Sequence, residues 1–310
     1  MRFLYVDRIL QCELGKSILG YKNVTRNEAL FYWLPNGQRV LSPAVVSESM
    51  AQLGAWLSIV SSDFMKRPVL LADEMTTYFR PVHSGECLRL EVEVLGTDGD
   101  VIVTKGSAKV GDELVAESKC TRGYLLDIDE FHDREQCQRD FRRLFTQGSS
   151  SQQSSFPVIP EFVPIPPLAG SYSFESLRYL DGIISHKAFD EVQSVKQIAS
   201  SESYFAEHFP RRPVVPGVML LSFVGETCQY LLKENIRGPL RSAALVPKFI
   251  RNVRFRKFVE PGDCCFIKVK VKEGNPRLDQ ELIVVSVTMM SQSHRVMQAE
   301  MGFMTMYTRS

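Results

Sequence analysis

Residues 202–226, ESYFAEHFPRRPVVPGVMLLSFVGE, decide the fold of this chain. Their first part places His208 in a loop braced by prolines, and their second part is an apolar run that begins at Gly217. Because proline fixes φ and glycine frees it, the loop is predicted to hold the imidazole in one position. The run after Gly217 is apolar almost all round, which predicts a helix buried inside a domain. The first amides of that helix would be unpaired donors that point toward the histidine loop.

An internal repeat relates the two halves of the chain. When the two halves are aligned so that Tyr5 matches Tyr179, a predicted helix at 42–60, SPAVVSESMAQLGAWLSIV, falls on the helix that follows Pro216. Ser42 is the predicted N-cap of this first helix, with Pro43 at its first position. We therefore predict two copies of one fold. The matched pairs are Tyr5 and Tyr179, Asp7 and Asp181, Ile9 and Ile183, Lys22 and Lys196, Glu28 and Glu202, and Phe31 and Phe205.

Strand-like runs follow each predicted helix in the same order. Runs at 75–82 and 252–259 precede the turns HSGE and EPGD, and alternating runs follow at 88–95 and 266–271 and again at 101–109 and 282–290. Alternation with a period of two is typical of half-buried strands. One long buried helix wrapped by a strongly bent antiparallel sheet fits this order of elements.

The length of the chain, 310 residues, is enough for two domains that each bury a core. Between the halves, 127–145 is charged and predicted to be helical, and 147–167, QGSSSQQSSFPVIPEFVPIPP, has the composition of a linker. We predict an amino-terminal domain at 1–128, a helix and linker at 129–169, and a carboxyl-terminal domain at 170–310.

Charge and cysteine content exclude several classes of protein. The 37 basic and 36 acidic residues give a net charge of +1, which favours neither nucleic acid nor a membrane surface as a partner. No apolar window approaches the roughly 20 residues of a membrane span, so we expect a cytoplasmic protein. The seven cysteines form no CxxC pair, which fits a reducing compartment. No His or Cys pair has metal-ligand spacing, and no GxSxG, GxGxxG or Walker motif occurs, so we expect no metal and no nucleotide cofactor.

The segment HFPRRPVVPGV at 208–218 and the helix after it resemble the signature of 3-hydroxyacyl-[acyl-carrier-protein] dehydratases, which have the hot-dog fold. The resemblance implies an α+β protein in which two hot-dog domains pair within one chain. In that family the loop carries the catalytic His, a glycine amide at the helix start binds the thioester carbonyl, and a Glu or Asp on the helix completes the site. These roles would fall to His208 and to Gly217, with Pro216 in support.

The position of the acidic residue differs from the family's pattern. Each half of the chain has the group that the other half lacks. The motif places the acid where the second half has Ser222, whereas the first helix carries Glu48 at the matching position, within ESMAQ. Conversely, the first half has Leu34 where the second has His208. In the family, the His of one hot-dog faces the acid of the other. We therefore predict one working site, His208 with Glu48, and one mirror site, Leu34 with Ser222, that has lost both groups.

Roles without any catalytic function also stay open for the same residues. His208 could be a loop histidine whose hydrogen bonds go to backbone, Gly217 could be a tight-turn glycine, and Glu48 could reach solvent. Gln52 lies one helical turn beyond Glu48 and is expected to hydrogen-bond it. Glu226 takes the equivalent place in the second helix, one turn too far along to be the acid, and is expected to be structural.

Basic side chains near the predicted site suggest a partner. Acyl carrier proteins are acidic, and a basic rim would attract them, although an ordinary solvated strand face explains the same residues. The rim residues are Arg211, Arg212, Arg254 and Arg256, with Lys248, Arg251 and Lys257 nearby.

Taken together, the resemblance implies dehydration of a (3R)-hydroxyacyl-[acyl-carrier-protein] to its trans-2-enoyl product, as in fatty acid biosynthesis. The phosphopantetheine arm would come with the substrate, and no other cofactor is expected. The alternatives are an acyl thioesterase of the same fold, which would not need His208, and a noncatalytic acyl-binding protein. Acyl chain length, pathway and any homo-oligomer beyond the internal pair are left open.

Overall fold

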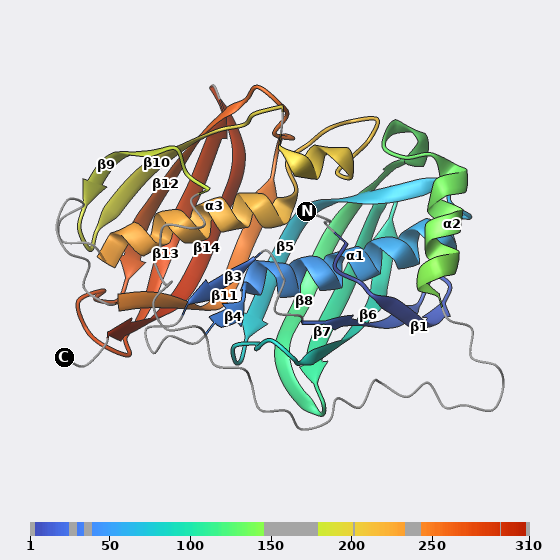
Figure 1. Ribbon diagram of the computed structural model, residues 1–310, viewed down its shortest axis with the longest axis horizontal. Helices are drawn as coiled ribbons and strands as arrows, with labels where there is room; N and C mark the ends of the chain where they lie inside the picture. Colours follow the sequence, from blue (N-terminus) through green and yellow to red (C-terminus); the bar gives the residue numbers. More distant parts are fainter. Residues whose placement is uncertain are drawn as a thin grey trace.

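The computed structural model of the chain describes residues 4–24, 30–33, 39–145, 179–200, 202–232, 243–291 and 293–307. Within them, two similar units lie side by side, each with one long helix against a bent antiparallel sheet (Figure 1). The predicted linker at 147–167 and Leu34 lie outside the described residues.

The elements of the two units follow the repeat. The first unit contains β1 (Arg8–Glu13), β2 (Ser17–Asn23), β3 (Phe31–Trp33), β4 (Arg39–Leu41), α1 (Pro43–Ser61), β5 (Lys66–Tyr78), β6 (Cys87–Asp98), β7 (Val101–Val110) and β8 (Glu113–Asp127). After it come a 3-10 turn, η1 (Ile128–Glu130), and α2 (Arg134–Leu144). The second unit contains β9 (Gly182–Lys187), β10 (Glu191–Gln197), η3 (Ser203–Ala206), α3 (Gly217–Gln229), η4 (Tyr230–Leu232), β11 (Ala243–Phe255), β12 (Cys264–Glu273), β13 (Leu282–Ser291) and β14 (His294–Tyr307).

Twelve of the described strands form one continuous sheet, in the order β1-β2-β6-β7-β8-β5-β11-β14-β13-β12-β10-β9. Every neighbouring pair is antiparallel. Since β5 and β11 occupy equivalent places in the two units, the order reads the same from either end, and the junction of β5 with β11 is the centre of the pseudo-dimer. The predicted pair of hot-dog domains is confirmed.

The two long helices lie on the same side of the sheet and contact each other (Figure 1). Most of their buried apolar side chains belong to one hydrophobic core that spans both units. Pro43 begins α1, where its fixed φ suits the first turn. Ser42 stands at the predicted N-cap position, but its side chain makes no capping hydrogen bond.

Strands β5 and β11 begin well before the runs at 75–82 and 252–259 that predicted them. The early parts of both strands contain a proline, Pro68 or Pro247, and lack a clear period of two, so local pattern does not reveal them. Hydrogen bonds to neighbours on both edges hold these two central strands extended. Strand β8 was not predicted either.

The charged segment after β8 packs on the first unit. Phe141 of α2 contacts the rings of Trp56, at 5.9 Å between centroids, and Phe64, at 6.0 Å. In the part of the chain that the structure describes, no helix is long and apolar enough to cross a membrane. The domain boundaries at 128 and 169 stay predictions.

Candidate active site

A cavity of about 420 Å³ lies where the two units meet, and residues of both units line it. Glu48, Gln52 and Arg67 come from the first unit, and His208 and Gly217 come from the second. The structure therefore brings the two predicted catalytic side chains, which are far apart in the sequence, to the walls of one cavity.

His208 lies in the loop between η3 and α3, and its ring is fixed by the backbone. Its Nδ1 is 3.0 Å from the carbonyl oxygen of Val214. Because that oxygen can only accept, Nδ1 carries the proton and Nε2 keeps a free lone pair. Burial lowers the pKa of His208 to about 4, with the positive charge of Arg67 acting in the same direction and the bond to Val214 opposing it. The imidazole is thus neutral near pH 7 and able to accept a proton.

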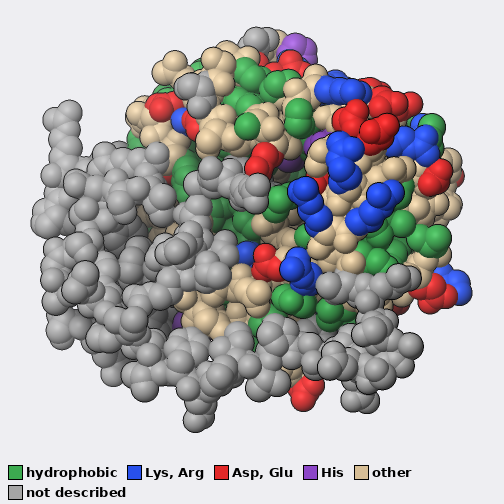
Figure 2. Space-filling view, turned by 45° about the vertical axis from the view of Figure 1, so that its right-hand side comes forward, with side chains coloured by type: hydrophobic (Ala, Val, Ile, Leu, Met, Phe, Trp, Pro, Cys, Tyr) green, Lys and Arg blue, Asp and Glu red, His purple; other side chains and the backbone are tan. Residues whose placement is uncertain are grey.

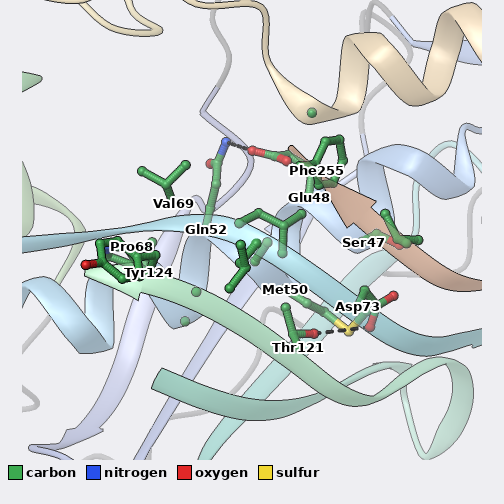
Figure 3. Close-up of a pocket in the computed structure, with 18 of the residues that line it drawn as sticks. Ser47, Glu48, Met50, Gln52, Pro68, Val69, Asp73, Thr121, Tyr124 and Phe255 are labelled. Atoms are coloured by element: carbon green, nitrogen blue, oxygen red, sulfur yellow. Dashed lines mark hydrogen bonds between the residues drawn. The ribbon is translucent and has the colours of Figure 1, made fainter. Parts of the chain in front are cut away.

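Glu48 projects from α1 into the same cavity. Gln52 donates from Nε2 to Glu48 Oε1 at 3.0 Å, as its spacing predicted (Figure 3). The backbone N–H of Tyr5 donates to Gln52 Oε1 at 2.8 Å, which fixes the direction of the amide. Burial raises the pKa of Glu48 to about 7, against the opposing effects of Gln52 and the charge of Arg67. Near neutral pH a substantial fraction of this carboxyl group carries a proton.

Gly217 is the first residue of α3, and Pro216 precedes it as the N-cap. The carbonyl of Pro216 accepts from the amides of Met219, at 3.0 Å, and Leu220, at 3.2 Å. Among the described residues, the Gly217 N–H has no hydrogen-bond acceptor, and it lies at the positive end of the helix dipole. The φ of Gly217 is not positive, so the turn itself does not require glycine here.

Arg67, at the start of β5, is a residue of the site that the sequence did not reveal. Its Nη1 is 2.8 Å from His132 Nε2, and its guanidinium lies 4.1 Å from the centre of the Phe209 ring. Burial lowers the pKa of Arg67 to about 10, so it remains charged at neutral pH. Its charge lowers the pKa of both His208 and Glu48. A single arginine within KRPV belongs to no motif, so no local signal could have identified it.

The segment between β8 and α2 of the first unit supports the histidine loop of the second. Phe131 packs edge-on against Phe209 with ring centroids 5.0 Å apart, and the Phe209 ring stacks on His208. His132 also contacts the Phe209 ring, and burial lowers its pKa to about 3, so it is neutral. The position of His208 thus depends on both units.

The predicted carrier-docking arginines fall into two groups. Arg211 pairs with Asp129, at 3.5 Å, and with Asp133, at 3.7 Å, and Arg212 pairs with Glu130 at 3.0 Å. These two arginines therefore connect the histidine loop to the first unit, and their docking role stays a prediction.

Arg254 and Arg256 are exposed and form no ion pair with other described residues. Arg256 also lines the cavity, together with Lys257. Figure 2 shows a group of Lys and Arg side chains on one face of the molecule, beside a group of acidic ones.

The counterparts of the site in the second helix have structural partners. Ser222, which stands where α1 has Glu48, donates to the carbonyl of Val218 within its own helix at 2.8 Å. Glu226, the counterpart of Gln52, accepts from the amides of Tyr179, at 2.7 Å, and Leu180, at 3.1 Å. Among the described residues, no group of three or more His, Cys, Asp or Glu side chains is placed to hold a metal ion.

The fold and the cavity place the chain in a class of double hot-dog proteins, and the comparisons identify the family. The FabA-like domain family matches residues 1–119 and 174–300, which covers both units. The chain belongs to this family.

Particular relatives align with less than half of the chain. The 3-hydroxyacyl-[acyl-carrier-protein] dehydratase FabZ of Desulforamulus reducens is 41% identical over 118 residues, which are 38% of this chain and 83% of that protein. FabZ of Symbiobacterium thermophilum is 38% identical over 117 residues, 37% of this chain and 82% of that protein. At the level of the family, the chain is therefore related to dehydratases.

Solved structures share the fold over almost the whole chain. A putative oleoyl thioesterase from Lactobacillus plantarum superposes with a TM-score of 0.56 at 8% identity, covering 95% of this chain and 98% of that one. The 12:0-ACP thioesterase from Umbellularia californica gives a TM-score of 0.50 at 10% identity and covers 93% of each chain. At such low identity the likeness concerns the fold alone.

Proposed function

We propose that this protein dehydrates a (3R)-hydroxyacyl-[acyl-carrier-protein] to the trans-2-enoyl product at one site between its two units. The observation that carries the proposal is the pairing of His208 and Glu48, from different units, in one cavity with opposite changes of pKa. A neutral imidazole is the form that accepts a proton, and a protonated carboxyl group is the form that donates one. The FabZ relatives, which are named for this reaction, support the same assignment.

The proposed reaction uses His208 as the base and Glu48 as the acid. His208 Nε2 removes the proton from C2 of the acyl chain, and the electrons of that bond form the C2–C3 double bond. The C3–O bond breaks, and the hydroxyl group leaves as water with the proton of Glu48. The proton on His208 then returns to Glu48 through solvent. The acyl chain undergoes no net oxidation or reduction, so the reaction requires no redox cofactor, and the phosphopantetheine arm arrives with the substrate.

The amide of Gly217 is proposed to hold the thioester carbonyl. Negative charge builds on that oxygen as the C2 proton leaves, and a fixed N–H at a helix N-terminus stabilises it. The Gly217 N–H is held in one direction because the carbonyl of the same peptide group, that of Pro216, accepts hydrogen bonds from amides further along the helix.

The carrier protein is proposed to dock at the cavity mouth beside Arg254 and Arg256. Their exposure and their lack of ion pairs with other described residues leave both guanidinium groups available to an acidic partner. The partner itself is taken from the names of the FabZ relatives.

The test is a turnover assay with the full chain and a 3-hydroxyacyl carrier protein, in which enoyl product and free carrier thiol are both measured. We expect enoyl formation, and we expect His208→Ala and Glu48→Gln each to lower the rate by about 10²–10⁴-fold. Ser222→Ala, the matched change in the other helix, should keep the full rate. Full activity in both site variants would overturn the proposal. Release of free thiol would instead identify a thioesterase, and binding without turnover a noncatalytic acyl-binding protein.

A further inference from the structure

A second polar group lines the cavity, apart from the proposed catalytic pair. Asp73 and Thr76 on β5 and Ser118 and Thr121 on β8 all contribute to the wall, and we call them the Asp73 cluster. Thr76 donates to Asp73 at 2.7 Å, Ser118 donates to Asp73 at 3.1 Å, and the hydroxyl groups of Ser118 and Thr121 are 2.7 Å apart. The carboxyl group is buried, since Asp73 is only 9% exposed.

The cluster lies in a different part of the cavity from the site of the proposed reaction. Figure 3 draws the bonded pair Asp73 and Thr121 well apart from the bonded pair Glu48 and Gln52. Both pairs line the same cavity of about 420 Å³, and Gly106, which also lines it, has no side chain to fill it. A chain bound at the first pair can therefore extend toward the second.

The fold does not require polar residues at these positions. By the repeat, the counterparts of Asp73 and Thr76 are Ile250 and Val253 on β11, which are both buried and line the same cavity. In the register of β5 with β11, Ile250 lies opposite Thr76 and Val253 lies opposite Asp73. Hydrocarbon thus fills the equivalent places in the second unit. A buried carboxyl group costs free energy, and burial raises the pKa of Asp73, so the cluster is a chemical feature of the cavity and not a need of the sheet.

The count of hydrogens in the cluster indicates which ligand group fits. Each hydroxyl group has one hydrogen to donate. The hydrogen of Thr76 goes to Asp73, and those of Ser118 and Thr121 are used for the bond between them and the bond to Asp73. What the cluster offers to the cavity is therefore oxygen lone pairs. A ligand group that brings its own hydrogen could bond to the remaining lone pairs, whereas a saturated hydrocarbon would leave those lone pairs unused and would displace water from them.

We infer that the cavity accepts acyl thioesters whose chain carries a hydroxyl or N–H group beyond C3, and that the Asp73 cluster binds this group. The inference rests on the proposed dehydration, because it names the substrate class of the same site. It assigns Asp73, Thr76, Ser118 and Thr121 to substrate selection and not to the chemical step.

The experiment compares 3-hydroxyacyl-pantetheine substrates of equal length, one series saturated beyond C3 and the other carrying a single further hydroxyl group at successive carbons. The wild-type protein should dehydrate the best hydroxylated substrate with a kcat/KM about tenfold above that of its saturated match. Turnover of 3-hydroxybutyryl-pantetheine, which is too short to need the cluster, tests the proposed function separately. If this short substrate turns over and the wild-type protein shows no preference in the longer series, the inference is wrong and the proposed function stands.

Two variants test whether the Asp73 cluster causes the preference for hydroxylated substrates. Thr121→Val keeps the shape of the side chain and should bring the ratio of kcat/KM for the hydroxylated and saturated substrates close to one. Asp73→Ile with Thr76→Val installs the residues of the second unit and should make the saturated substrate the better one. Thr104→Val also changes the cavity wall but lies outside the cluster, so it should keep the wild-type ratio. An unchanged ratio in both cluster variants, with melting temperatures showing that they fold, would contradict the inference.

Discussion

The two halves of this protein have nearly the same fold but different cavities. The cavity that contains His208 and Glu48 has a volume of about 420 Å³, whereas its counterpart across the pseudo-twofold axis has about 20 Å³. The repeat shows that the two are counterparts, because the small cavity is lined by the equivalents of large-cavity residues. The pairs are Leu41 and Val215, Pro43 and Gly217, Val46 and Leu220, Tyr78 and Phe255, and Arg80 and Lys257.

Besides the predicted exchange of His208 for Leu34, three replacements distinguish the small cavity from the proposed active site. Pro43 stands where Gly217 stands in the other unit, and proline has no N–H to offer a carbonyl oxygen. Ser222 replaces the acid. Tyr78 replaces Phe255, and its buried hydroxyl group bonds to Ser47 at 2.6 Å. Under the proposed mechanism, the pair of hot-dog units supplies a place for a site, and that place works only where a base, a backbone donor, an acid and free volume occur together.

Among exchanges of residues between the two units, the largest effect is expected from copying Pro43 into the second unit. Gly217→Pro is designed to remove only the N–H that is proposed to bind the carbonyl. The first position of a helix tolerates proline. The residue before a proline must be extended, and Pro216 already is, with ψ of 143°. We expect kcat to fall by about 10²–10³-fold, the usual cost of one oxyanion donor, as measured by single-turnover kinetics.

Gly217→Ala is the matched control for that change, since it keeps the N–H. Its new Cβ would lie 3.9 Å from the Phe255 ring, an ordinary contact, so the rate should change little. Equal losses in the alanine and proline variants would show that space at the helix start, and not the amide, is what matters.

A second prediction concerns the pH dependence of kcat/KM. The working form requires neutral His208, whose pKa is about 4, and protonated Glu48, whose pKa is about 7. The kcat/KM should therefore fall as pH drops through about 4 and again as pH rises through about 7. Gln52→Glu copies Glu226 from the other helix and places a second carboxyl group beside Glu48. It should raise the pKa of Glu48 and move the alkaline limb to higher pH.

The Gln52→Glu variant should fold normally, because Glu226 shows that a glutamate at this position keeps its bonds to backbone amides. The measurement is a pH–rate profile of wild type and variant under identical ionic strength. If the alkaline limb does not move, a group other than Glu48 controls it.

The smallest effect is expected from removing an arginine, Arg256, at the large cavity. In the small cavity, Arg80 is held by Glu86, at 3.1 Å, and by Glu113, at 2.7 Å, whereas Arg256 at the large cavity is exposed and unpaired among the described residues. Arg256→Ser should raise KM a few-fold, by roughly 3–10-fold, for a carrier-bound substrate at low salt and leave KM for a pantetheine substrate unchanged.

Lys119→Ser removes the same charge from an exposed position on β8 and serves as the control. An equal rise of KM in this control, or for the pantetheine substrate, would exclude a local docking role for Arg256.

The site residues that could be predicted from the sequence are those with a local signal. The spacing of Gln52 from Glu48 on one helix predicted their hydrogen bond, and the repeat predicted two units with their helices in matching places. Residues whose role depends on distant contacts could not be predicted. Arg67 gains its role from His132 and Phe209, and Asp73 gains its partners from β8.

The sequence by itself determined the two-unit fold and the histidine loop, because proline, glycine and apolar periodicity act over a few neighbouring residues. Only the tertiary structure decided the shape and polarity of the cavity and the protonation of the groups in it. The pKa of His208 and that of Glu48 are set mainly by burial between two units, and burial is a property of residues that meet in space and not along the chain.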